Sequence, residues 1–112
     1  MKKIEVIFYN VSKNEFTKET IENLDDYYKL LKCSLFDVVR LDNNINLYVD
    51  DEGLLKSGNL VSDIKYKDYE SKLVGNIIIT CGIDSKGNSL SCSIDINTAK
   101  EIIKFNPNYI VK

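Results

Sequence analysis

The sequence contains no histidine and no tryptophan, and it has only one proline. Without histidine the chain lacks the usual general base near neutral pH, a common zinc ligand and any Ser–His or Cys–His nucleophile. An enzyme with this composition would have to use carboxylates, lysine, tyrosine or cysteine. No apolar run approaches the ~20 residues that a membrane-spanning helix needs. These absences favour a non-enzymatic protein with no cofactor, no metal and no membrane segment.

Cysteine is also scarce. The three cysteines, Cys33, Cys81 and Cys92, are odd in number and have no C-x-x-C spacing. Their apolar surroundings predict reduced, packed thiols, with Cys81 and Cys92 facing each other across adjacent strands. Residues 1–10 have neither the apolar region nor the cleavage site of a signal peptide, and they predict a first strand instead. We therefore expect a cytoplasmic protein.

Length and charge limit the remaining classes. A chain of 112 residues, 44% hydrophobic and 29% charged, is expected to fold as one globular domain spanning residues 1–112. The formal net charge of −2 argues against a general nucleic-acid binder, which needs a broad basic face.

The first third of the chain has clear local signals. Residues 3–11 alternate and are rich in β-branched and aromatic side chains, which predicts a strand, and a short second strand is expected within residues 13–23. Asn23 is a good N-cap for a following helix. Asp25 and Asp26 would then lie in the first turn, where the helix dipole favours carboxylates.

The remainder predicts further strands. They are expected at residues 34–41, 44–50, 52–56, 73–83 and 90–94, with a loop at 57–72 and a helix at 96–105. The first two form a hairpin around a turn at 42–44. Asn106 and Pro107 are expected to end the helix. The predicted fold is α+β: a mostly antiparallel curled sheet of about five or six strands, with two short helices on one face.

An acidic stretch looks at first like a metal site. Residues 50–52 are three successive carboxylates, and Gly53 follows them. An EF-hand loop needs oxygen ligands at its first, third and fifth positions, glycine at the sixth and glutamate at the twelfth. With Gly53 at the sixth position, the first is Tyr48 and the twelfth is Asn59, so the pattern fails. The stretch predicts a tight turn.

The same region carries a family resemblance. The order of a helix, the strand segment Val38–Leu41, the acidic turn Asp51–Gly53 and the segment Leu73–Gly75 before an apolar strand resembles domain of unknown function 3846. The resemblance covers roughly residues 22–95. It implies a small accessory protein of phages, plasmids or conjugative elements of Gram-positive bacteria, and no catalytic residue. Many members continue after the acidic turn with "LPxNR"; this chain has "KSGN", in which Asn59 is the one match.

Seven tyrosines are many for this length. Tyr66 and Tyr69 lie in the expected loop and alternate with Lys65 and Lys67. Aromatic faces can stack on nucleobases while ammonium groups contact phosphates. The alternative interpretation is a connector whose tyrosines cover the edge of the core.

Arg40 is the only arginine, and it is expected on a strand face shared with Phe36 and Val38. A lone guanidinium there either pairs with a neighbouring carboxylate or receives an anion in a bidentate manner. The candidate ligand-binding residues are therefore Arg40, Asn59, Lys65, Tyr66, Lys67 and Tyr69.

The leading functional hypothesis is a phage or mobile-element protein that acts against host defence in the bacterial cytoplasm. It would sequester a small anionic nucleotide signal in a pocket between subunits of a homo-oligomer, without catalysis. The alternative is an inhibitor that binds a host defence protein as an acidic DNA mimic. A carboxylate-rich contiguous face would favour mimicry, and a closed pocket lined by tyrosine and lysine would favour sequestration.

Overall fold

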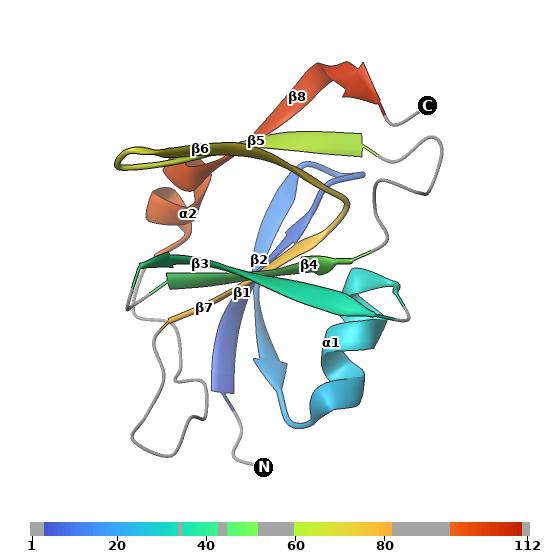
Figure 1. Ribbon diagram of the computed structural model, residues 1–112. Coiled ribbons are helices and arrows are strands. Elements are labelled where there is room, and N and C mark those ends of the chain that lie inside the picture. The colour runs from blue at the N-terminus through green and yellow to red at the C-terminus, as the bar shows by residue number, and fades with distance from the viewer. Residues whose placement is uncertain (1–3, 34, 43–44, 52–59, 82–94, 111–112) are drawn as a thin grey trace.

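The computed structural model describes residues 4–33, 35–42, 45–51, 60–81 and 95–110. In these residues the chain forms eight strands and two helices (Figure 1). Their bounds in chain order are β1 Ile4–Asn10, β2 Glu15–Ile21, α1 Leu24–Leu31, β3 Phe36–Asp42, β4 Ile45–Asp50, β5 Leu60–Tyr66, β6 Tyr69–Val74, β7 Ile77–Thr80, α2 Ile96–Ile102 and β8 Ile103–Ile110.

The strands form two sheets. Sheet A has five strands in the order β2-β1-β7-β4-β3, and sheet B has three in the order β6-β5-β8. Every strand pair in the described residues is antiparallel. The predicted α+β class with antiparallel pairing is confirmed, although the strands divide between two sheets.

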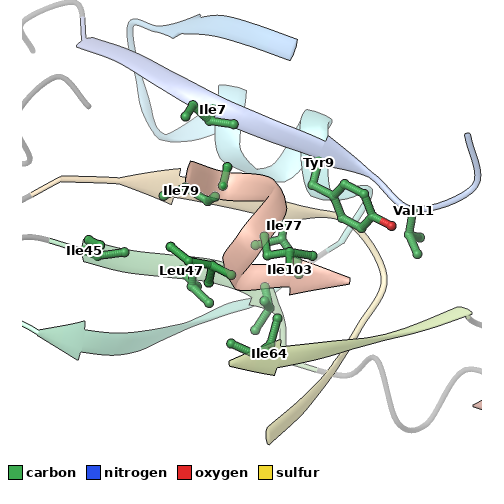
Figure 2. Packing of buried hydrophobic residues seen from close by; sticks show 12 residues of the cluster. Ile7, Tyr9, Val11, Ile45, Leu47, Ile64, Ile77, Ile79 and Ile103 are labelled. Carbon is green, nitrogen blue, oxygen red and sulfur yellow. The ribbon is translucent and has the colours of Figure 1, made fainter. Parts of the chain in front are cut away.

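The main core lies between the two sheets and is called the inter-sheet core here. Period-two alternation directs one face of each strand into it, as Figure 2 shows for side chains from β1, β4, β5, β7 and β8. Its fully buried members include Ile7, Tyr9, Leu47, Ile64, Ile77, Ile79 and Ile103. Helix α2 closes this core at one side through Ala99 and Ile102.

Helix α1 covers the opposite face of sheet A. Tyr27 and Leu31 pack there against Val6 and Ile78, and the Tyr27 ring stacks on Tyr48 with centroids 4.7 Å apart. Tyr48 therefore points away from the inter-sheet core. The two helices lie on different layers (Figure 1), so the expectation that both cover one face is wrong. Each strand of sheet A has apolar side chains on both faces, so a separate layer must pack against each face to bury them.

The predicted start of α1 is confirmed. Asn23 is extended and its Oδ1 accepts the Asp26 N–H at 3.3 Å, while the Asp26 carboxylate accepts the backbone N–H groups of Glu22 and Asn23. This reciprocal pair is a capping box, which satisfies donors that the helix cannot satisfy itself. Asp95 caps α2 by accepting the Thr98 N–H at 2.8 Å, and this hydrogen bond lowers the pKa of Asp95.

The second helix is shorter than expected. It ends at Ile102, and residues 103–110 continue as β8, so the predicted helix over 96–105 is wrong at its end. Ile103 and Phe105 alternate into the inter-sheet core, as a strand requires. Pro107 lies within β8, which is an edge strand, where a missing N–H is tolerated.

The expected loop at residues 57–72 is also wrong over its described part. Residues 60–66 and 69–74 are β5 and β6, which pair from Val61 opposite Val74 to Tyr66 opposite Tyr69. The strand expected at 73–83 is divided, because β6 ends at Val74 and β7 begins at Ile77 in the other sheet. Gly75, with φ of +82°, makes the crossing between them. The left-handed region of this dihedral favours glycine.

Cys81 is buried and disulfide-bonded, so the expectation of three reduced thiols is wrong at this residue. Cys33 is not in a disulfide. Cys92, the expected strands at 52–56 and 90–94, and the Gly53 turn lie outside the described residues. Neither of the described helices has the length and apolar character needed to cross a membrane.

Candidate functional site

The β5–β6 hairpin directs its side chains to two different faces. Tyr66 and Tyr69 are half-buried and pack against the inter-sheet core, and the Lys67 ammonium lies 5.2 Å from the centroid of the Tyr66 ring. Lys65 alternates with Tyr66 and is exposed. The tyrosines therefore cover the edge of the core, which was the alternative interpretation of their spacing.

Charged side chains gather on the outer face of sheet B, away from the inter-sheet core. Here an open hollow of about 550 Å³ is lined by Asp63, Ile64 and Lys65 on β5, Glu70, Ser71 and Lys72 on β6, Ile102 on α2 and Lys104 on β8. We call it the outer-face hollow. Its volume lies within the ~300–1,000 Å³ range of small-molecule sites. Three lysines against two carboxylates leave one net positive charge in its lining.

The ion pairs in the outer-face hollow are exposed. Lys72 Nζ lies 3.3 Å from Asp63 Oδ1, and Lys65 Nζ lies 3.6 Å from Glu70 Oε1. All four of these side chains are about half exposed or more. Within the part of the chain that the structure describes, Lys104 has no carboxylate partner. Exposed ion pairs contribute only about 0–1 kcal/mol each, so an incoming anion can compete for these lysines at low cost.

Asp63 is held in place from β8. Asn106 Nδ2 donates to both carboxylate oxygens of Asp63, at 3.2 and 3.3 Å. This contact fixes the position of the Asp63 carboxylate on sheet B. The Lys72 ammonium, by contrast, sits on a flexible side chain that can reorient. The arrangement offers lysine ammonium groups to which an anion can bind.

The other predicted site residues lie elsewhere. Arg40 is exposed on β3, at the edge of sheet A, directly across the strand pair from Asn46. Its neighbours Val39 and Leu41 pack into the inter-sheet core, so Arg40 points to the α1 side. Within one protomer it is therefore separated from Lys65 by sheet A and the core. Asn59 lies outside the described residues.

Among the described residues, no three of the Cys, Asp and Glu side chains lie together as a metal site would require. Asp51 is in a turn, as predicted, and its N–H donates to the Leu35 carbonyl oxygen at 3.0 Å.

Sequence reasoning singled out Lys65 but missed Lys104. The alternation of Asp63 with Lys65, and of Glu70 with Lys72, was a signal for a charged strand face that the loop interpretation hid. Lys104 had no such signal. It reaches the hollow because β8 pairs with β5, with Lys104 directly opposite Asp63.

The fold and hollow define a small antiparallel α+β protein with a lysine-lined hollow on its smaller sheet. The family model described as "Domain of unknown function (DUF3846)" matches residues 1–104, and the chain belongs to this family. The match confirms the resemblance seen in the sequence and extends it to β1, β2 and α2. Comparisons with curated proteins and with solved structures gave no match.

Proposed function

We propose that this protein is a non-enzymatic binding protein of a phage or mobile genetic element, and that it sequesters a small anionic nucleotide of a host defence pathway. The observation that carries the proposal is the outer-face hollow, in which Lys104 has no carboxylate partner among the described residues and stands with Lys65 and Lys72. The absence of histidine from the sequence also fits binding better than catalysis.

Binding would work by exchange of ion-pair partners. A phosphate group accepts several charge-assisted hydrogen bonds, and Lys104 offers one without giving up an existing partner. Lys65 and Lys72 can then turn from Glu70 and Asp63 toward the ligand. The hollow is open and contains no tyrosine, unlike the closed tyrosine-and-lysine pocket that the sequence suggested. In this proposal the half-buried Tyr66 and Tyr69 support the hairpin that carries the lysines.

Native mass spectrometry of protein purified from cells with active nucleotide signalling tests the proposal. We expect a co-purifying nucleotide that leaves intact on denaturation. In calorimetric titrations with this nucleotide, Lys104→Gln should weaken binding about ten-fold, or about 1.4 kcal/mol, because a charge-assisted contact is lost. Lys72→Gln should weaken binding less and reduce its salt dependence.

Lys29→Gln is the matched control, because Lys29 is exposed on α1, on the far side of sheet A. It should leave the affinity unchanged. Chemical conversion of the nucleotide would contradict the non-enzymatic part of the proposal. Absence of any bound anion, together with stoichiometric capture of a host defence protein, would favour the inhibitor alternative; exposed Leu35 and Val38 beside the β3 edge could then contact that protein.

The proposal includes a homo-oligomer. Leu35 and Val38 are 54% and 43% exposed, and they lie at or before β3, an edge strand of sheet A. A second copy of the chain that packs against this edge would bury the two apolar side chains and protect the edge strand. Light scattering at micromolar concentration should give a mass at least twice the 12.8 kDa of one chain. A monomer would show that no pocket forms between subunits.

The proposed compartment is the host bacterial cytoplasm, where nucleotide signals would be met. One feature runs against it. Cys81 is disulfide-bonded, and disulfides are uncommon in that compartment.

A further inference from the structure

A second hollow lies on the other side of Lys104, where α2 and the start of β8 meet the β1–β2 turn. It measures about 530 Å³ and is lined by Asn14, Phe16, Lys100, Ile103, Lys104 and Phe105. We call it the Phe16–Phe105 hollow. Its lining combines two aromatic rings, two ammonium groups and an amide, and it contains no carboxylate.

The two ammonium groups of this hollow carry charges of the same sign. Within the described residues neither Lys100 nor Lys104 has an ion pair, whereas Lys18, Lys65 and Lys72 each have one. Lys100 lies in the last turn of α2, and Lys104 follows four residues later on β8. Two like charges on one hollow repel each other, and an anion bound between them removes that repulsion.

The aromatic side chains of the hollow are held by the core behind them. Phe16 and Phe105 are half-buried, and the Phe16 ring packs on Tyr9 with centroids 4.5 Å apart. Phe105 lies directly across the β5–β8 ladder from the buried Ser62. Half-buried rings fixed in this way offer preformed surfaces for stacking.

Asn14 gives the rim a directed donor. It adopts φ of +50° in the turn between β1 and β2, and its Oδ1 accepts the Tyr9 hydroxyl at 2.9 Å. Burial raises the pKa of Tyr9, so this hydroxyl keeps its proton and remains a donor throughout the neutral range. Because the side-chain oxygen of Asn14 already accepts this hydrogen bond, its Nδ2 takes the role of donor to a ligand.

We propose that the Phe16–Phe105 hollow binds the aromatic base of a nucleotide, with Lys100 and Lys104 contacting its phosphate. This inference deepens the proposed function and rests on it, because Lys104 lines both hollows. The phosphate would lie at Lys104, between the base in one hollow and the lysines Lys65 and Lys72 of the other. The ligand class is therefore a nucleotide rather than a phosphate or a phosphosugar.

Two probes that differ only in the base test the inference: AMP and ribose 5-phosphate, titrated into the full chain by calorimetry. We expect AMP to bind roughly five- to hundred-fold more tightly, the range for one base stacked on an aromatic side chain. Phe16→Leu and Phe105→Leu retain apolar volume in the core but remove the ring. Each should reduce the preference for AMP several-fold and leave ribose 5-phosphate binding unchanged.

Phe8→Leu is the control, since Phe8 is a half-buried phenylalanine on the α1 side of β1. It should preserve the preference for AMP. Lys100→Gln should weaken both probes to a similar degree, and circular dichroism should show native folding of every variant.

The outcomes separate the two proposals. Equal affinity for AMP and ribose 5-phosphate, or a preference that survives both phenylalanine substitutions, would overturn the inference while leaving anion binding intact. A base preference that depends on Phe16, together with an affinity for both probes that depends on Lys100 but not on Lys72, would support the inference and remove the outer-face hollow from the site. If neither probe binds at millimolar concentration, both proposals fail.

Discussion

Replacing Ile79 with alanine should lower the free energy of unfolding by about 2–5 kcal/mol, the range for truncating a large buried aliphatic side chain. Ile79 is fully buried on the central strand of sheet A, directly opposite Ile7 on β1 and Leu47 on β4. It faces the inter-sheet core, where neighbours from both sheets surround it. A cavity there is difficult to close, because neither sheet can move without disturbing its hydrogen-bonded ladder.

Urea denaturation followed by far-ultraviolet circular dichroism measures this effect, since the chain has no tryptophan to report on folding. Val38→Ala provides the comparison. Val38 is also a β-branched residue on sheet A, but it is 43% exposed, and its truncation should change stability by less than about 0.5 kcal/mol. Similar losses for both substitutions would mean that the core is not packed as described.

Replacing Asn76 with alanine should destabilise the protein by about 2–4 kcal/mol, although it removes only a small polar side chain. Asn76 Oδ1 accepts the Val11 N–H at 3.1 Å, and Asn76 Nδ2 donates to the Leu30 carbonyl oxygen at 3.1 Å. This one side chain joins the end of β1, the last turn of α1 and the crossing into β7. Its loss leaves a buried donor and an acceptor without partners, at about 1–3 kcal/mol each.

Asn10→Ala is the matched comparison, because Asn10 Oδ1 accepts the exposed Lys13 N–H at 3.3 Å. Water can replace that contact, so the loss should be below about 1 kcal/mol. Asn76→Asp keeps the acceptor for Val11 but places a carboxylate beside the Leu30 carbonyl oxygen, and it should be destabilised as well. Full stability of Asn76→Asp would show that the contact with Leu30 contributes nothing.

The proposed anion site is compatible with the net charge of −2. Overall charge governs long-range attraction, but a bound phosphate interacts mainly with the charged groups within a Debye length of about 8–10 Å. Lys100 and Lys104 provide a local excess there, since neither has a carboxylate partner in the described residues. The net charge argues against a broad nucleic-acid surface and leaves a small local site open.

Where the sequence was misleading, the cause can be identified in particular residues. The β5–β6 hairpin was missed because its turn has no glycine, asparagine or proline at its left-handed position. That position is Lys67, with φ of +51°. The cross-strand pair of Tyr66 and Tyr69 and the cation–π contact of Lys67 stabilise a turn that local preferences do not favour. Pro107 was taken as a helix stop, yet it lies within an edge strand.

The sequence by itself determined the elements whose signals are local. Alternation defined β1 and the β3–β4 pair, and the capping residues around Asn23 defined the start of α1, because both depend on neighbours a few residues apart. It also determined the absence of histidine chemistry. Only the tertiary structure decided which strands share a sheet, that Arg40 and Lys65 lie apart, and that Lys104 joins Lys65. These placements depend on the burial of side chains that are far apart in the chain. The sequence pattern shows which face of an element is apolar, but it does not show which other element packs against that face.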